Sequence, residues 1–439
     1  MKKGIFYSFL TQVTTSVLSI ITGILLSRFL GPEGRGLITL LQTDATFLLF
    51  LFGMSFPTAI TYFISNKQID PEKIVGSMII LLTVSSLVVG LTLFLIQSTT
   101  FSDFFNLELN IGGAYLLLFF FYFFGLGNIL LQSFFEGFSE FKVINRIIVL
   151  TAISNLFFIG SIYLLLSFLS DEQKIHVAGF ALIVSSIIVF GLWIIYYSKK
   201  LKIKINFNVT SNEIKHILGF SGIAYLCNLL NYLNYRFDFW IVQRYFGNYD
   251  LGIYSLSVNL SQSLWLIITP ISLVLFPKFN GQSLDKEEKR RIFLLSLKLV
   301  MMVIFFSQVA TFIFSGFLVP LVYGGEFMNS VLPLKILVCG ILFSCLSKLI
   351  AMYFVTSGEV KINLKATVIG LIFTIPLDLI LIPKLGLVGA SLATSITYLA
   401  ILSSQMMFGR KVLQIKLSQV LTFNSSEIEI QKSAWNQLR

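Results

Sequence analysis

Seven ionisable residues lie inside long apolar stretches of this chain, where a charged side chain is costly to bury. They are Asp44, Asp238, Asp378, Arg236, Lys298, Lys335 and Lys348. Exposing all seven to hydrocarbon would cost on the order of 20 kcal/mol, which exceeds the net stability of a typical fold. We therefore expect most of them to face water, an opposite charge or a ligand, and they are the first candidates for a binding site.

Polar residues are densest in residues 215–243. One stripe at helical spacing contains Asn228, Asn231, Asn234 and Asp238, and a second stripe contains Tyr225, Tyr232, Arg236 and Gln243. A helix that is polar on two faces is not mainly exposed to lipid, so we expect it to line a water-filled central cavity. The alternative is hydrogen bonding between closely packed dry helices.

The three carboxylates are candidates for ion coupling, because a carboxylate within a helix bundle can load and release a proton or bind sodium. Of Asp44, Asp238 and Asp378, we place Asp238 first, and the alternative is that Asp238 only neutralises a neighbouring cation. The three lysines are candidates for binding an anionic substrate. Their long stems also reach polar headgroups, so anchoring at the interface is an open alternative for all three.

The composition excludes a water-soluble protein. Hydrophobic residues make up 56% of the 439 residues and charged residues only 12%, about half the charged share of a soluble domain. A Walker-type phosphate loop is missing, as is a soluble loop large enough to hold a sugar donor, so we expect no enzyme activity. His176 and His216 lie apart in short loops, and the spacing of the three cysteines is not paired. We therefore expect neither a metal site nor a disulfide scaffold.

Apolar stretches of about 20 residues, the length that crosses a bilayer as a helix, divide the chain. We predict an all-α integral membrane protein with twelve transmembrane helices, at residues 5–27, 37–64, 74–97, 111–135, 144–169, 175–198, 215–243, 252–276, 292–322, 329–356, 364–382 and 386–408. Lys and Arg number 23 on one side and 5 on the other, which predicts cytoplasmic N- and C-termini. The net charge of +11 is thus a topology signal and does not indicate nucleic-acid binding.

Two segments 216 positions apart match each other. Residues 28–40 and 244–256 share an Arg, two apolar residues, a Gly and a second Gly five positions later. Each segment joins the first two spans of a six-span half, so the halves are parallel repeats with a substrate path between them. We predict an N-lobe, a cytoplasmic linker, a C-lobe and a polar cytoplasmic tail, at residues 1–200, 201–214, 215–410 and 411–439.

Arg28 and Arg244 hold matching positions in this repeat, at the predicted outer ends of the first and seventh spans. Guanidinium groups suit bidentate capture of phosphate oxygens, so two of them could clamp one anion. The alternative is a pair of interface anchors that duplication has copied.

Five blocks of the sequence resemble the motifs of bacterial polysaccharide transporters. They are RFLGPEGRG at 28–36, DLGIYS at 250–255, FPK at 276–278, YGGEF at 323–327 and LIPKLGLVGASLAT at 381–394. Over about residues 1–410 the chain is similar to the O-antigen (Wzx-type) and capsule repeat-unit flippases. These belong to the multidrug/oligosaccharidyl-lipid/polysaccharide (MOP) exporter superfamily.

The resemblance implies a MATE-like, V-shaped bundle of two six-helix lobes that works by alternating access in the bacterial cytoplasmic membrane. It implies a cargo of undecaprenyl pyrophosphate carrying an oligosaccharide, driven by a proton or sodium gradient and without a cofactor. Arg236, with Arg28 and Arg244, would then bind the pyrophosphate or an acidic sugar. Tyr232, Asn231 and Asn234 would contact sugars. Membrane lipids, a polysaccharide polymerase and glycosyltransferases are the implied partners.

Two other functions stay open. A cation-coupled multidrug exporter of the same superfamily would be expected to carry a cavity dominated by carboxylates, and the four basic and three acidic residues inside spans speak against it. A membrane scaffold that organises polysaccharide assembly without transport would tolerate the loss of charges from residues 215–243.

Overall fold

The described part of the chain is almost entirely helical, as the apolar stretches predict. The computed structural model describes residues 2–53, 56–97, 114–166, 168–208, 210–268, 271 and 286–413. The predicted polar tail at 411–439 lies almost wholly outside these residues.

Contacts between residues divide the chain into two compact units. The first contains Met1–Ser255 and Val322–Glu326, and the second contains Leu256–Leu321 and Phe327–Arg439. This boundary follows packing and lies later in the chain than the predicted linker at 201–214. The lobe boundaries rest on the sequence repeat and stay a prediction.

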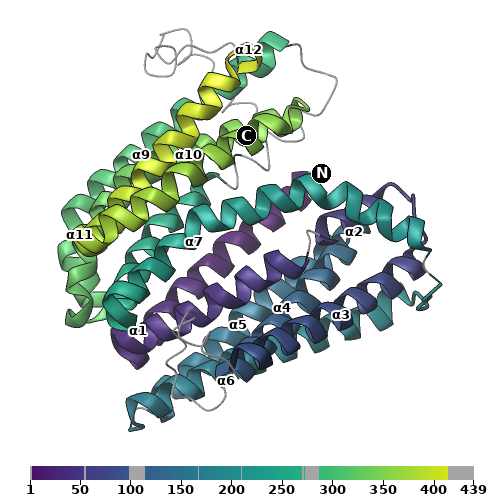
Figure 1. Cartoon of the computed structure of the whole chain (residues 1–439), viewed down its shortest axis with the longest axis horizontal. Coiled ribbons are helices and arrows are strands. Elements are labelled where there is room, and N and C mark those ends of the chain that lie inside the picture. The colour runs from purple at the N-terminus through teal and green to yellow at the C-terminus, as the bar shows by residue number, and fades with distance from the viewer. Residues whose placement is uncertain are drawn as a thin grey trace. The chain divides into compact units, whose positions relative to one another are not determined.

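The described residues of the first unit form seven helices and one π-helical turn. They are α1 (Lys2–Gly53), α2 (Phe56–Ser65), α3 (Pro71–Gln97), α4 (Ala114–Gly137), α5 (Phe141–Leu165), α6 (Asp171–Tyr196), η2 (Tyr197–Leu201) and most of α7 (Ser211–Gln262). Helix α1 packs on α4, α5 and α6, and α4 also packs on α2 and α3 (Figure 1). Phe63, Tyr122 and Phe134 are fully buried where α2 and α4 meet. Large apolar side chains of this kind supply most of the packing energy.

The second unit contains the remaining helices. They are η3 (Ser263–Ile267), α9 (Lys286–Tyr323), η4 (Gly325–Ser330), α10 (Val331–Thr356), α11 (Val360–Phe408) and α12 (Arg410–Leu413), with the last turn of α9 and the first residues of η4 assigned to the first unit. Helices α10 and α11 lie side by side (Figure 1). Phe293 of α9 stacks on Tyr353 of α10 with ring centroids 4.5 Å apart, which ties α9 to the same group.

Three long helices each contain one glycine whose backbone is not helical. Gly31 in α1, Gly247 in α7 and Gly386 in α11 have φ of 65°, 80° and 60°. Positive φ is readily adopted only by glycine, so each of these residues breaks its helix into two segments. Gly31 and Gly247 are partners in the predicted repeat, 216 positions apart. The two matching segments of sequence therefore form the same local turn.

The protein is a multi-pass membrane protein. Eight described helical stretches are long and apolar enough to cross a bilayer: Leu10–Gly53, Pro71–Ile96, Ala114–Gly137, Phe141–Leu165, Asp171–Leu201, Glu287–Tyr323, Gly325–Thr356 and Val360–Phe408. Helix α7 is not among these eight described stretches. The total of twelve spans and the cytoplasmic placement of both ends stay predictions.

The segment between η2 and α7 lies against the start of α3. Lys73 Nζ of α3 pairs with Glu213 Oε1 of α7 at 2.8 Å, and the Asn206 amide donates to the Glu72 carbonyl at 3.1 Å. A Cβ atom added to Gly76 would clash with the Asn206 carbonyl oxygen. Glycine at position 76 thus allows this connection to approach the α3 backbone.

Replacing Glu213 with Gln should cost a modest amount of stability that depends on pH. The hydrogen bond from Lys73, followed by the one from the Thr210 amide, lowers the pKa of Glu213 from 4.5 to about 2. A lowered pKa means that the pair stabilises the fold above about pH 4.5 and loses this effect as the pH falls towards 2. Because both side chains are partly exposed, we expect roughly 0.5 kcal/mol.

Thermal unfolding of the detergent-solubilised protein checks this effect. The variant should melt below the parent at about pH 6, the difference should shrink below about pH 4.5, and the two should converge as the pH approaches 2. Lys73→Gln should produce the same shift, and adding it to Glu213→Gln should produce no further loss. A difference that persists undiminished at low pH would contradict the ion pair as its cause.

Candidate functional site

Three aromatic side chains of α7 hold the second segment of α1. The Trp240 indole Nε1 donates to Asp44 Oδ1 at 2.7 Å, and the Tyr232 hydroxyl donates to the carbonyl oxygen of Thr43 at 2.5 Å. One further hydrogen bond, 3.3 Å long, runs from the Tyr225 hydroxyl to the Leu51 carbonyl. Spacings of seven and eight residues place these donors on one face of α7, and Figure 1 shows α1 and α7 running beside each other.

Asp44 is buried next to the aromatic side chains of Phe47, Tyr232 and Trp240, which we call the aromatic wall. Its side chain is 5% exposed, and in the described part of the chain its Oδ2 atom has no hydrogen-bond donor. Phe47 packs edge-on against Trp240 at 5.3 Å between ring centroids and stacks on Tyr232 at 6.4 Å. A charged carboxylate in such surroundings pays a desolvation cost that one neutral donor does not offset. The arrangement therefore favours binding of a proton or another cation at Asp44.

Arg236 brings a positive charge close to the same place. Its guanidinium carbon lies 4.7 Å from the centre of the Phe239 ring, and the side chain is half-buried. Arg236 follows Tyr232 by four residues, one helical turn further along α7. The structure thus brings together three of the predicted site residues, a carboxylate on α1 and a cation and a phenol on α7. This is the α1/α7 site.

Asp238 points to a different neighbour. Its Oδ2 atom accepts a 2.6 Å hydrogen bond from the hydroxyl of Tyr254, a fully buried residue beyond the Gly247 break. Phe239 packs edge-on against the same tyrosine at 5.8 Å. A carboxylate that accepts a short bond from a buried phenol is held firmly in place. Asp238 therefore joins the two segments of α7 to each other. If Asp238 also couples transport to an ion, it combines that function with this structural role.

The predicted asparagine stripe spans several environments. Asn234 is buried, Asn231 is half-buried and Asn228 is exposed. The stripe thus runs from the packed interior to the surface of the first unit, and the wet cavity expected along it stays a prediction.

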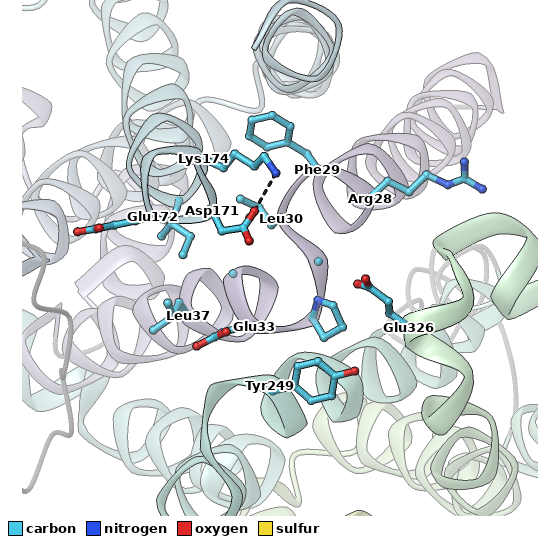
Figure 2. Close-up of a pocket in the computed structure, with 14 residues that line it drawn as sticks. Arg28, Phe29, Leu30, Glu33, Leu37, Asp171, Glu172, Lys174, Tyr249 and Glu326 are labelled. Carbon is cyan, nitrogen blue, oxygen red and sulfur yellow. Dashed lines mark hydrogen bonds and ion pairs between the residues drawn. The ribbon is translucent and has the colours of Figure 1, made fainter. Parts of the chain in front are cut away.

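Arg28 lies in a cavity of about 570 Å³ beside the Gly31 turn (Figure 2). Its Nε donates to the Val322 carbonyl at 2.7 Å. Four carboxylates and one lysine also line the cavity: Glu33, Asp171, Glu172, Glu326 and Lys174. Lys174 is paired with Asp171 at 2.8 Å, and in Figure 2 the Arg28 side chain extends away from that pair. The surroundings of Arg28 are therefore acidic.

Arg244, the repeat partner of Arg28, is exposed and does not line this cavity. The structure does not bring the two arginines to a common cavity in the described first unit. A clamp made by both would need a different arrangement of the chain, and it stays a prediction.

The lysines of the second unit have separate surroundings. Lys298 is only 1% exposed, so its stem does not lie along the surface as an interfacial anchor would. Lys335 lies 5.9 Å from the centre of the Phe312 ring, and Lys348 lies 4.0 Å from that of Trp265. Lysine and indole at that distance form a cation–π contact.

Asp378 of α11 is buried, with an exposed fraction of 1%. Thr374 lies one helical turn before it, and the Thr374 hydroxyl bonds to the Thr397 hydroxyl at 3.2 Å and to the Gly370 carbonyl at 3.0 Å. Oxygen atoms of this kind are the ligands that hard cations prefer.

Two residues that the sequence analysis did not single out are central to the first unit. Trp240 lies one helical turn after Arg236, on the same face of the helix as Tyr232. This position in the sequence could have identified Trp240 as a site residue. Arg35 is one of the five Lys and Arg residues that the predicted topology places on the outer side, yet it is 7% exposed and bonds to Ser255 Oγ at 3.3 Å. The repeat partner of Arg35 is the apolar residue Leu251. An apolar residue at the matched position was the sign in the sequence that position 35 is buried.

Comparison with known proteins places the chain among polysaccharide-related membrane proteins. The sequence model of a family described as "Polysaccharide biosynthesis protein" matches residues 1–283. The chain is 28% identical over 324 residues to the capsular polysaccharide biosynthesis protein CapF of Staphylococcus aureus, covering 70% of this chain and 81% of CapF.

Two solved structures share the fold. The lipid II flippase MurJ in an inward closed conformation has a TM-score of 0.71 at 16% identity, covering 96% of this chain and 89% of MurJ. An inward-facing multidrug resistance MATE family transporter of the MOP superfamily also has a TM-score of 0.71 at 16% identity, covering 92% and 98% of the two chains. At this identity the likeness concerns the fold alone.

Proposed function

This chain belongs to the polysaccharide biosynthesis protein family, and from that premise we propose that it is a flippase for a lipid-linked oligosaccharide. The cargo would be an oligosaccharide on undecaprenyl pyrophosphate, moved from the inner to the outer leaflet of a bacterial cytoplasmic membrane. A fold shared with a lipid II flippase and a relative named for capsule synthesis support this proposal. A polysaccharide polymerase and glycosyltransferases are the partners that such a cargo requires.

The observation that carries the proposal is the α1/α7 site, where Arg236, Tyr232 and Asp44 come together. Arg236 offers a planar set of donors to a pyrophosphate or an acidic sugar. Asn231 and Asn234, on the neighbouring face of α7, offer amide groups to sugar hydroxyls. Arg28, Arg244 and the three lysines of the second unit are further cations for the anionic cargo.

Coupling to a proton or sodium gradient is the second part of the proposal. Asp44 is the leading carboxylate because one of its oxygen atoms has no donor among the described residues and its neighbours are aromatic. Asp238 and Asp378 are the other candidates. Binding of a cation at Asp44 would relieve the cost of burying its charge, so the ion would favour one conformation over another.

Arg236→Ala should lower polymer export at least about tenfold, because a charge-assisted bond to phosphate is worth roughly 1.5 to 3 kcal/mol. The measurement is surface polymer in a strain that carries the variant at normal membrane level. Arg236→Lys should retain part of the activity, since lysine keeps the charge and loses the bidentate geometry. Arg28→Ala should have a smaller effect, because Arg28 lies among carboxylates.

The matched control is Lys200→Ala, which removes a cation that is paired with Glu140 and does not line the cavity beside Arg28. It should export polymer normally. If Arg236→Ala also exports as well as the parent, Arg236 does not bind the anionic cargo. That result would instead agree with a membrane scaffold that does not transport.

A cation-coupled multidrug exporter is the second candidate, and the aromatic wall around Asp44 favours it. Phe47, Tyr232 and Trp240 around a carboxylate form surroundings that also suit an organic cation. A strain without the protein would then become sensitive to cationic dyes and keep its surface polymer. Loss of polymer with unchanged dye sensitivity would support the flippase.

A further inference from the structure

The turn between α4 and α5 has the same backbone geometry as the turn between α10 and α11. In the first turn the amide of Glu140 donates to the Phe135 carbonyl at 3.1 Å, and in the second the amide of Glu359 donates to the Phe354 carbonyl at 2.8 Å. The residue before each glutamate has a positive φ, 57° in the first turn and 79° in the second. Corresponding residues are 219 positions apart, and both phenylalanines are fully buried. The similarity of the two halves therefore extends to these turns.

Each turn is followed by two exposed cations at corresponding positions. Lys142 and Arg146 lie in the first two turns of α5, and Lys361 and Lys365 lie in the first two turns of α11. Residues four positions apart share one face of a helix, so the members of each pair are neighbours. Among the described residues none of the four is in a salt bridge, and Lys365 lies 5.9 Å from the centre of the Phe408 ring. We call these four residues the paired cations.

The helix faces that carry the paired cations continue as exposed apolar surface. On α5 the side chains of Leu150, Ile153 and Phe157 are 39%, 48% and 65% exposed, and on α11 those of Val368 and Ile372 are 40% and 63% exposed. They follow the second cation of each pair in steps of three and four residues, so they lie on the same face. Ile153 and Ile372 correspond at the offset of 219. Each face thus has cations at one end and an apolar surface beyond them, which matches the headgroup and the acyl chains of a phospholipid.

The charges at these turns suit an anionic headgroup. The paired cations lie at the predicted cytoplasmic ends of the spans predicted at 144–169 and 364–382, and the cytoplasmic leaflet carries anionic lipids. Like charges four positions apart on a helix repel each other, so a phosphate between them would relieve that repulsion. Glu140 and Glu359 precede the first cation by two residues, which places them on roughly the opposite side of each helix. Glu140 is also paired with Lys200.

We propose that each unit binds one anionic phospholipid of the cytoplasmic leaflet, with the phosphate at the paired cations and the acyl chains along the exposed apolar face. A phospholipid suits these sites better than the cargo, because the same site is present in both halves, whereas the substrate path of parallel repeats is a single path between them. The proposal goes beyond the proposed function and does not depend on which cargo moves.

Lipid binding to the purified full-length protein tests the proposal. Native mass spectrometry should find two tightly held molecules of dioleoyl phosphatidylglycerol on each protein. Dioleoyl phosphatidylcholine has the same acyl chains and no net charge, so it should bind at least about tenfold more weakly.

Removing the paired cations should remove the sites one at a time. Lys142→Gln with Arg146→Gln should leave one tightly held phosphatidylglycerol, and so should Lys361→Gln with Lys365→Gln. Each double change should weaken its own site roughly tenfold or more, and the variant with all four changes should lose both sites. Arg146→Lys keeps the charge and should keep both lipids.

The matched control is Lys67→Gln with Lys200→Gln. Both residues are exposed cations of the first unit outside the face of α5 that carries the paired cations, so this variant loses the same charge and should still hold two lipids. Thermal unfolding in detergent gives a second readout, because a ligand that binds only the folded state stabilises it. Phosphatidylglycerol should raise the melting temperature of the parent and of the control, and it should not raise that of the variant with all four changes.

The outcomes separate the lipid sites from the cargo. Phosphatidylglycerol binding that the four changes leave unaltered, or equal binding of the two phospholipids, would overturn the proposal. Displacement of phosphatidylglycerol from both sites by an equimolar amount of undecaprenyl phosphate would also overturn it and would assign the paired cations to the cargo. Two tightly held phosphatidylglycerol molecules on a protein that moves no lipid-linked oligosaccharide would support the lipid sites and refute the proposed cargo.

Discussion

Gly252→Ala should destabilise the protein by about 3 kcal/mol, because the new methyl group would collide with the carbonyl oxygen of Pro32. A backbone oxygen cannot rotate away as a side chain can, so the two helical segments would have to separate. For a chain of 439 residues we expect the apparent melting temperature in detergent to fall by roughly 3 °C. Thermal unfolding followed by size-exclusion chromatography of the surviving protein measures this shift.

The matched control is Gly191→Ala in α6, where a Cβ atom would meet no atom within 4 Å. It should melt like the parent or slightly above it, because alanine favours the helix. Gly36→Ala should behave like Gly252→Ala, because a Cβ atom on Gly36 would collide with the carbonyl oxygen of Asn248. A Gly252→Ala variant that melts with the parent would show that the segments do not cross as closely as the structure places them.

Asp44→Asn should reduce transport by on the order of a hundredfold and leave the protein folded. Asparagine keeps the Oδ1 acceptor for Trp240 and nearly the same volume, so the contact between α1 and α7 survives. It removes the charge that binds the coupling ion, and an ion with no preference between two conformations cannot shift their populations. Polymer export, normalised to protein in the membrane, measures the effect.

Two variants separate the loss of charge from the loss of structure. Trp240→Phe removes the donor to Asp44 and keeps an aromatic ring against Phe47, so we expect a reduction of only a few fold. Asp171→Asn removes a carboxylate from an exposed ion pair and should leave transport unchanged. If Asp44→Asn transports like the parent, Asp44 does not couple transport to an ion. Asp238→Asn and Asp378→Asn are then the variants to test in the same way.

Much of the fold could be predicted from local patterns. Apolar stretches of membrane-spanning length indicated helices, and the structure is almost wholly helical where it is described. Residues 28–40 and 244–256 matched each other in sequence, and the matched residues Gly31 and Gly247 are both breaks with positive φ. Both results follow from interactions within a few residues along the chain, which sequence periodicity reports directly.

Less of the candidate site could be predicted. The sequence placed Arg236 and Tyr232 on one face of a helix, and both lie in α7, one helical turn apart. The ranking of Asp238 above Asp44 for ion coupling stays a prediction. The structure adds that Asp238 is bonded to a tyrosine of its own helix and that Asp44 is bonded to Trp240 of α7. Periodicity identifies the faces of a helix, but it does not say which face a second helix will cover.

The sequence by itself determined an all-helical membrane protein, a repeat at an offset of 216 and the types of residue that lie at each matched position. Only the tertiary structure decided that Gly36 meets Gly252, that Arg35 is buried and that Trp240 binds Asp44. The physical reason is distance along the chain. Helix formation depends on neighbours within one or two turns, whereas these contacts join residues about 200 positions apart and depend on how whole helical surfaces fit together.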